Sequence, residues 1–200
     1  MNDVKINTVT NEPRFYSDLC ETLSFAWQLI EQGVTDRNTM AHTPVLSTVG
    51  PSDEPKSRSM VLRDARRVDR MLLFYSDSRS WKIEEIISNP MASVLFYEMS
   101  KKIQVRMVCI LSVHMANEYS KKRWDNVQKT SRISYQSALP PGARIENPAT
   151  LEYQDEGERN FAVLEAEIRS LEWLYLSSRG NRRALFQWDK GIETSSWLVP

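Results

Sequence analysis

The stretch ASVLFYEMSKKIQVRMVCILSV, residues 92–113, contains two runs rich in β-branched and aromatic residues, separated by a short polar segment. Such runs are typical of β-strands, and a connection of this length joins two antiparallel strands in a hairpin. We therefore predict strands over residues 92–98 and 103–113, with a turn at 99–102. One basic residue, Arg106, lies inside the second of these strands.

Further strand-type runs occur on both sides of this hairpin, and three helical patterns interrupt them. The additional strands are predicted at 45–49, 60–62, 71–75, 161–168, 171–177 and 184–188. Helices are predicted from Pro13 to an end at Gly33, over 78–89 with Pro90 following, and over about 116–129. This arrangement predicts an α+β domain around an antiparallel sheet, and the pattern alone does not decide between a barrel and an open sheet.

The chain has 200 residues, with 26 basic and 26 acidic side chains and a formal net charge of zero. This length predicts one domain. The charge balance argues against a nucleic-acid binder or a protein of anionic membrane surfaces, because such proteins usually carry a basic excess. No apolar run approaches the ~20 residues that span a bilayer. The N-terminus lacks the apolar stretch of a signal peptide, so we expect a cytoplasmic protein.

Few of the usual catalytic or metal-binding signals are present. His42 and His114 are far apart and show no metal-ligand spacing, so no metal site is predicted. No G-x-S-x-G motif supports a serine nucleophile, and the residues alone assign no catalytic group. The six glycines form no phosphate-binding loop. Any bound phosphate must therefore be held mainly by side chains.

Basic side chains within or beside apolar strands and at a helix start are the unusual feature of the sequence: Arg58, Arg63, Lys82 and Arg106. They are either edge charges in ion pairs or a preformed anion site. In an anion site, several cations and hydroxyls would hold a phosphate dianion by charge-assisted hydrogen bonds. The adjacent pair Glu84 and Glu85 is predicted to lie on a solvated helix face, because neighbouring helical residues point in different directions.

Five motifs in a fixed order carry a family resemblance: RSMVLR at 58–63, LFYS at 73–76, RSWK at 79–82, NPMASVLFY at 89–97 and KKIQVR at 101–106. With the C-terminal segment, this pattern resembles the pyridoxamine 5'-phosphate oxidase family, the FMN-binding split barrels. The resemblance implies an antiparallel split β-barrel with a few flanking helices. It places a single FMN-binding domain at 13–200, and residues 1–12 are expected to form a flexible N-terminus.

The resemblance implies FMN as the cofactor and assigns most of its contacts. Lys82 matches the phosphate-binding lysine, with Trp81 where the family often has an arginine. Gln104 matches a glutamine that contacts the flavin ring, and Met60, Leu62 and Trp173 are candidate apolar walls. The complete set is Arg58, Ser59, Met60, Val61, Leu62, Arg63, Tyr75, Ser76, Trp81, Lys82, Gln104, Gln136, Ser137, Trp173 and Arg183.

For the substrate, the resemblance implies contacts from Arg63, Tyr119, Arg123 and Arg179. Val127 and Asn181 stand where the family has a serine and a histidine. The implied function is an FMN-dependent oxidoreductase, which would oxidise pyridoxamine or pyridoxine 5'-phosphate, or a related small substrate, through flavin N5. A homodimer is expected, with the flavin between the subunits. The alternatives are a flavin carrier or sensor without this activity, and a split-barrel dimer without a ligand.

Overall fold

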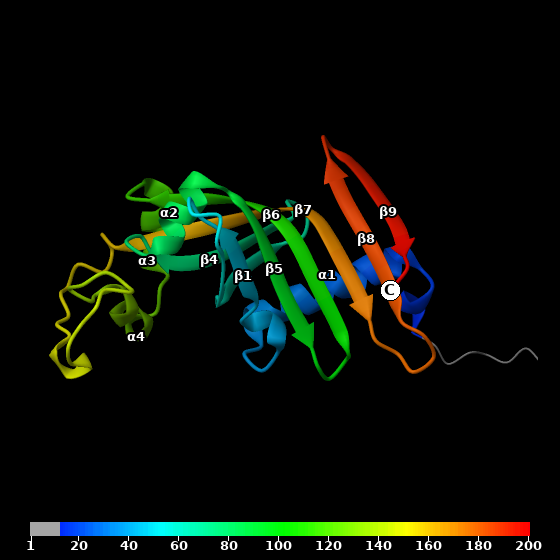
Figure 1. Ribbon diagram of the computed structural model, residues 1–200, viewed down its shortest axis with the longest axis horizontal. Helices are drawn as coiled ribbons and strands as arrows, with labels where there is room; N and C mark the ends of the chain where they lie inside the picture. Colours follow the sequence, from blue (N-terminus) through cyan, green and yellow to red (C-terminus); the bar gives the residue numbers. More distant parts are fainter. Residues whose placement is uncertain (1–12) are drawn as a thin grey trace, which may run out of the picture.

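The computed structural model describes residues 13–200, and its elements form a mainly antiparallel sheet flanked by helices (Figure 1). The N-terminal segment that we expect to be flexible, residues 1–12, lies outside the described residues. The strands are β1 Val45–Val49, β2 Pro55–Ser59, β3 Leu62–Arg66, β4 Met71–Asp77, β5 Met91–Glu98, β6 Ile103–Met115, β7 Phe161–Tyr175, β8 Arg182–Asp189 and β9 Ile192–Leu198.

The sheet divides along its longest strand. The order is β2-β1-β5-β6-β7-β4-β3, and every pairing is antiparallel. One edge of β7 pairs with β6, whereas its other edge pairs first with β4, through 161–167, and then with β8, through 170–175. β9 extends the β8 branch. The expected α+β split-barrel class is confirmed, and in this chain the sheet does not close.

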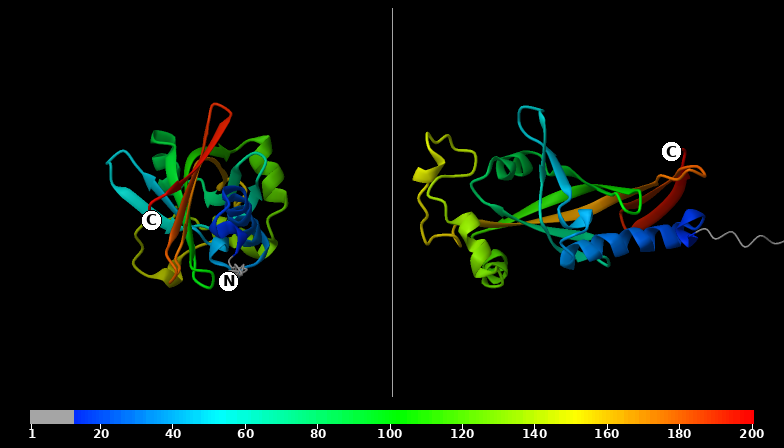
Figure 2. Two further views of the ribbon diagram at one scale, coloured as in Figure 1. Left: turned by 90° about the vertical axis from the view of Figure 1, so that its right-hand side faces the viewer. Right: turned by 90° about the horizontal axis from the view of Figure 1, so that it is seen from below.

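Helix α1, Leu19–Thr35, lies along one face of the sheet and covers the main core (Figures 1 and 2). The strands alternate, so that Val94 and Phe96 of β5 and Val105 and Met107 of β6 point into this core. Burial of each such side chain contributes about 1.5–3 kcal/mol to folding. The opposite face of the same strands is half-buried to exposed, and it carries polar residues that bear on the site.

The remaining helices lie at the end of the molecule opposite β8 and β9 (Figure 1). They are α2 Trp81–Ser88, α3 Glu118–Asp125 and α4 Lys129–Arg132. Short 3-10 turns precede and follow α1, at Arg14–Tyr16 and Met40–His42, and two more lie between α4 and β7, at Ile133–Tyr135 and Pro148–Thr150. A second apolar cluster forms there, in which Trp124 and Tyr135 pack against Phe161. This cluster fixes the start of the loop after Tyr135, which carries Gln136 and Ser137.

Several predicted boundaries are wrong. The strand predicted at 60–62 does not form, because Met60 and Val61 separate β2 from β3. The first helix starts at Leu19 and continues past Gly33 to Thr35. The strands predicted at 161–168 and 171–177 are one strand, β7, with an irregular register opposite Val108 and Cys109. The polar helix predicted over about 116–129 is shorter, since α3 ends at Asp125, and a separate short helix, α4, begins only at Lys129.

Within residues 13–200, no helix is both long and apolar enough to cross a membrane.

Candidate functional site

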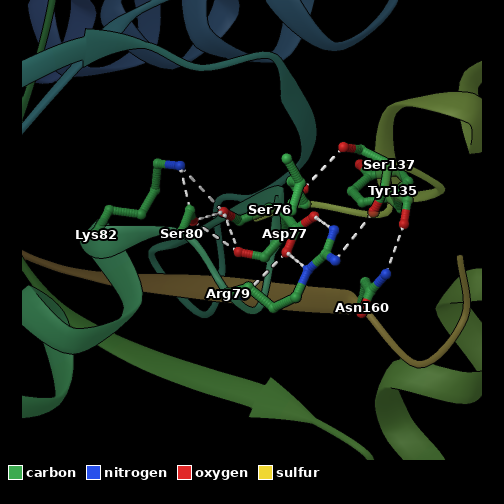
Figure 3. Close-up of polar contacts among 9 residues, drawn as sticks. Ser76, Asp77, Arg79, Ser80, Lys82, Tyr135, Ser137 and Asn160 are labelled. Atoms are coloured by element: carbon green, nitrogen blue, oxygen red, sulfur yellow. Dashed lines mark hydrogen bonds and ion pairs between the residues drawn. The ribbon is translucent and has the colours of Figure 1, made fainter. Parts of the chain in front are cut away.

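An ammonium group surrounded by hydroxyls lies where β4 meets α2 (Figure 3). Lys82, in the first turn of α2, donates from Nζ to Ser80 Oγ at 3.0 Å and to Ser76 Oγ at 3.3 Å. The two serine oxygens are 3.1 Å apart. We call Ser76, Ser80 and Lys82 the hydroxyl–ammonium cluster. The turn around Asp77 builds it, since the Asp77 carbonyl accepts hydrogen bonds from both the backbone N–H and the hydroxyl of Ser80.

The electrostatics of this cluster favour an anion. Burial lowers the pKa of Lys82, and the nearby positive charge of Arg58 lowers it further. In the described part of the chain, the Lys82 ammonium forms no ion pair, and its hydrogen bonds go to the neutral hydroxyls of Ser76 and Ser80. A half-buried cation with only neutral partners is stabilised when an anion arrives. The predicted pair Ser76 and Lys82 is thus brought together, and Ser80 joins them.

Arg58, which we also expected to contact a phosphate, is already engaged by a carboxylate. Its guanidinium donates to Glu85 Oε2 at 2.9 Å and to the Thr48 hydroxyl. Thr48 in turn donates to the same carboxylate oxygen at 2.6 Å, and Lys56 lies 3.3 Å from Oε1. The prediction that Glu85 lies on a solvated face is wrong, since this residue is only 3% exposed. Its neighbour Glu84 is exposed, as expected.

Stability should decrease in acid because of this buried carboxylate. Burial alone would raise the pKa of Glu85, but hydrogen bonds from Thr48, Arg58 and Lys56 outweigh it, and the pKa lies below its ordinary value. A depressed folded pKa gives stability that is full above the unfolded pKa of about 4.3 and is lost as the pH falls through the folded pKa. We expect urea midpoints that are constant near neutrality and fall below about pH 4.5.

Two substitutions at adjacent positions separate this effect from general acid unfolding. Glu85→Gln leaves Arg58 and Lys56 without their carboxylate, and it should lower the free energy of unfolding at pH 7 by about 1–3 kcal/mol. It should also make the stability less dependent on pH in the acid range. Glu84→Gln removes an exposed charge and should change neither quantity. Equal effects of the two substitutions would contradict a buried ion pair at Glu85.

The loop with Gln136 and Ser137 lies beside the hydroxyl–ammonium cluster. Arg79 donates from Nη1 to the Ser137 carbonyl at 3.0 Å, and its other guanidinium nitrogens bind the Asp77 carboxylate (Figure 3). The Gln136 amide donates to Asp155. Arg79 therefore links the Ser137 loop to the turn around Asp77, which carries the hydroxyl–ammonium cluster. Trp81 is 65% exposed, and Lys56 lies over its ring.

A second group forms around Tyr75 of β4. The Arg63 guanidinium lies over the Tyr75 ring, 5.4 Å from its centroid, and burial raises the pKa of the Tyr75 hydroxyl. Both residues line a cleft of about 220 Å³, together with Arg37 and Val127. The structure thus brings the predicted residues Arg63 and Tyr75 together.

The predicted substrate residues Tyr119 and Arg123 adjoin this group, but acidic side chains engage them. Tyr119 donates its hydroxyl to Glu165 Oε1 at 2.6 Å, and Arg66 binds the same oxygen at 2.6 Å. Arg123 lies 3.5 Å from Asp64 Oδ2. Sequence reasoning missed Glu165, because a single glutamate in a strand gives no local signal of its partners.

Two other predicted residues, Gln104 of β6 and Arg183 of β8, lie beside the end of β7 that pairs with β8. Gln104, Leu174 and Arg183 are in register across β6, β7 and β8. Arg183 and Arg106 both bind Glu172 Oε2, at 2.9 and 2.7 Å. The prediction that basic residues form ion pairs thus holds at Arg106. Arg179 lies in the β7–β8 connection, where its backbone carbonyl accepts a hydrogen bond from Tyr16.

The apolar candidates lie mostly inside the protein. Met60, Leu62 and Trp173 belong to the main core, and Trp173 is fully buried beside Phe15 and Tyr175. Val61 is half-buried, and Ser59 is exposed at the end of β2. Their predicted cofactor contacts stay predictions. Sequence reasoning did not select Ser80, although its position two residues before Lys82 is a signal that could have found it.

Comparisons with known proteins agree with this picture. The family model described as "Pyridoxamine 5'-phosphate oxidase, FMN-binding domain" matches residues 25–115, which confirms the resemblance seen in the motifs. This range includes Ser76, Ser80, Lys82 and Gln104. Among curated proteins, no sequence matches the chain significantly.

Two solved structures share the fold over nearly the whole chain. One is a pyridoxamine 5'-phosphate oxidase-related, FMN binding protein from Nostoc punctiforme PCC 73102, with 20% identity, a TM-score of 0.72, and coverage of 90% of this chain and 96% of that one. The other is PhzG from Burkholderia lata 383, in complex with tetrahydrophenazine-1-carboxylic acid. It has 17% identity, a TM-score of 0.72, and coverage of 94% and 97%. At these identities, the likeness is one of fold.

Proposed function

Because residues 25–115 match the FMN-binding domain of the pyridoxamine 5'-phosphate oxidases and the chain has the split-barrel fold, we propose that this protein is an FMN-dependent oxidoreductase. Its FMN phosphate binds at Ser76, Ser80 and Lys82. Its substrate is a small molecule that is oxidised beside the flavin ring. The assembly is a homodimer in which each flavin contacts both subunits.

The observation that carries this proposal is the hydroxyl–ammonium cluster. Lys82 supplies a positive charge, and Ser76 and Ser80 supply two hydroxyls within 3.3 Å of it. A phosphate dianion can accept hydrogen bonds from all three groups, and such charge-assisted bonds are about twice as strong as neutral ones. Arg58 adds a second cation nearby, although Glu85 neutralises part of its charge. The donor set therefore fits the phosphate of FMN.

When bound, FMN supplies two-electron redox chemistry, and the protein supplies position and electrostatics. The Ser137 loop, held by Arg79, borders the phosphate end of the site. Gln104 has an amide that can hydrogen-bond the polar edge of the flavin ring, and Arg183 lies on the same sheet face. Gln104 of β6 and Arg183 of β8 both lie beside the end of β7 that pairs with β8, whereas Ser76 of β4 lies beside its other end.

A homodimer explains how Gln104 and Arg183 can reach the same flavin as Lys82. The sheet face that carries Gln104 and Arg183 also carries the half-buried apolar side chains Val45, Leu95, Val108, Leu174 and Leu185. On this face the apolar side chains surround the ion-paired group of Arg106, Glu172 and Arg183, and such a mixed surface is compatible with a two-fold interface between identical chains. Such an interface can bring Gln104 and Arg183 of one subunit to the Lys82 cluster of the other, so the flavin site is complete only in the dimer.

The dimer predicts a coupled loss of assembly and cofactor affinity. Val108→Lys places a charge on this sheet face, between Ser93 and Ser170, so the mass in solution should fall from two chains to one, and FMN affinity should fall at least tenfold. Sedimentation measures the mass, and titration with FMN measures the affinity. Val68→Lys adds the same charge at a valine that is 91% exposed, and it should change neither. A monomeric wild-type protein with bound FMN would contradict the dimeric site.

Purification and turnover test the proposed activity. The purified protein should carry the visible absorption of bound flavin. The FMN-loaded dimer should consume oxygen and form peroxide when an oxidisable amine or alcohol such as pyridoxamine 5'-phosphate is added. A protein that binds FMN but turns over no substrate in a screen of such compounds would disprove the oxidoreductase and leave the cofactor site intact.

The contacts of Tyr119 and Arg123 favour a second candidate. Because Glu165 and Asp64 engage these two side chains, the place expected for a substrate phosphate contains carboxylates that repel one. This observation favours a substrate without a phosphate, or a flavin carrier or sensor without pyridoxamine phosphate oxidase activity. Pyridoxamine compared with its 5'-phosphate, at equal concentrations, distinguishes these possibilities in the turnover assay.

A further inference from the structure

A cleft of about 340 Å³ lies between the N-terminal half of α1, the β3–β4 turn and the β8–β9 hairpin. Figures 1 and 2 show the start of α1 passing beside β8 and β9. None of the residues that we assign to the flavin or its substrate lines this cleft. Its volume is at the lower end of the roughly 300–1,000 Å³ that small-molecule sites occupy. It is therefore large enough for a small ligand that is separate from the flavin.

Aromatic side chains form the inner wall of the cleft. Trp27 of α1 and Phe186 and Trp188 of β8 line it, and each is at most 7% exposed. Leu23 adds an aliphatic contact from α1. Flat aromatic surfaces that are held rigidly by the core favour a flat apolar ligand, because ring-on-ring contacts add to the gain from apolar burial.

Two arginines from the β3–β4 turn border this apolar wall. The Arg70 guanidinium lies over the Trp188 ring, 5.6 Å from its centroid, and its Nε is buried without a hydrogen-bond partner. Arg67 makes a long hydrogen bond of 3.4 Å to the Ser24 hydroxyl. Between residues 13 and 200, neither guanidinium forms an ion pair, whereas the adjacent Arg66 binds both Glu165 and Asp69. An unpaired buried donor is destabilising, and an anion would satisfy it.

The acidic residue of the cleft does not neutralise these arginines. Glu193 of β9 accepts a hydrogen bond from the Trp188 indole at 2.9 Å, which holds its carboxylate on the β8–β9 side. The cleft therefore combines an aromatic wall with two cations at one border. We propose that this cleft is a second ligand site, which binds a small aromatic carboxylate with its ring against Phe186 and Trp188 and its carboxylate at Arg67 and Arg70.

A cysteine provides a local reporter for this site. Cys20 of α1 lines the cleft and is exposed, whereas the only other cysteine, Cys109, is fully buried. A thiol reagent such as 5,5'-dithiobis(2-nitrobenzoate) should therefore react first at Cys20. With the FMN-loaded protein, 1-naphthoate should slow this reaction at least threefold at saturation. The amine of the same ring system, 1-naphthylmethylamine, should not slow it.

Variants of the two arginines decide the question. Arg67→Gln and Arg70→Gln should each weaken the protection by 1-naphthoate about tenfold, and the double variant should abolish it. Arg67→Lys with Arg70→Lys keeps the charges and should retain partial protection, which controls for folding. Arg159→Gln removes a charge that is 81% exposed, outside the cleft, and should have no effect. Protection that persists in the double glutamine variant, equal protection by the amine, or no protection at millimolar naphthoate would overturn the proposal.

Discussion

Replacing Lys82 with alanine is expected to raise the dissociation constant for FMN about 10- to 100-fold, because a hydrogen bond to a charged group contributes roughly 1.5–3 kcal/mol. The substitution removes the cation that, among residues 13–200, donates hydrogen bonds to Ser76 and Ser80. In the variant, the phosphate of FMN can still bind the two serine hydroxyls, but it no longer has a positively charged partner beside them. Fluorescence titration of the cofactor-free protein with FMN measures the change.

Riboflavin provides the matched ligand for this experiment, since it has the same ring system without the phosphate. Lys82→Ala should leave riboflavin affinity within about twofold of the wild type, since the lost interaction is with the phosphate. Lys101→Ala, at an exposed position in the β5–β6 turn, should leave both affinities unchanged. An equal loss for FMN and riboflavin would place Lys82 beside the ring instead of the phosphate.

The position of Lys82 was predictable from sequence, whereas the partner of Arg58 was not. Ser76, Ser80 and Lys82 are close in the chain, so one turn and one helix start bring them together. The contact between Arg58 and Glu85 joins an edge strand to the buried side of α2, and it depends on how the helix packs. Two adjacent glutamates look alike in the sequence. Only the packing distinguishes exposed Glu84 from buried Glu85.

The fold was predicted best where strands are buried. The hairpin of β5 and β6 appears nearly as expected, because its alternating apolar residues form the core. Three strands were missed, β3, β2 and β9, and all of them lie at sheet edges. The side chains of β2 and β9 are mostly exposed. Their sequences, PKSRS and IETSSWL, contain many polar residues. An edge strand with solvent on both faces needs no apolar alternation, so the periodicity that identifies strands is absent.

The relative positions of the predicted site residues in space could not be predicted from the motifs either. Their order matches the family pattern, but order along the chain does not place Gln104 and Arg183 relative to Lys82. The structure places Gln104 and Arg183 beside the end of β7 that pairs with β8. Ser76, which binds Lys82, lies on β4, which pairs with the other end of β7. The separation of these residues within one chain therefore favours a site that is shared between two chains. This is the physical basis of the dimer that we propose.

Substitution of Gly33 is expected to destabilise the fold even though alanine favours helices. Gly33 lies inside α1, and a Cβ atom there would meet the backbone carbonyl carbon and oxygen of Ala41 at 2.6 Å. The His42 ring also binds the Gly33 carbonyl at 2.7 Å, so the turn at Met40–His42 cannot easily move away. We expect Gly33→Ala to lower the free energy of unfolding by about 1–3 kcal/mol, and Gly33→Val by more.

Comparing glycine with alanine at an exposed position of α1 measures the intrinsic helix preference without the contact at Ala41. Gln28 is exposed, so Gln28→Ala should be more stable than Gln28→Gly by about 1 kcal/mol, which is the ordinary helix propensity difference. At position 33 the sign should be reversed, with alanine less stable than glycine. Ala41→Gly should restore little of this loss, since the nearest atoms belong to the backbone and remain in the double variant. Urea unfolding of the five variants measures these differences. If alanine were favoured equally at both positions, close contact with Ala41 could not be the reason for a glycine in the last turns of this helix.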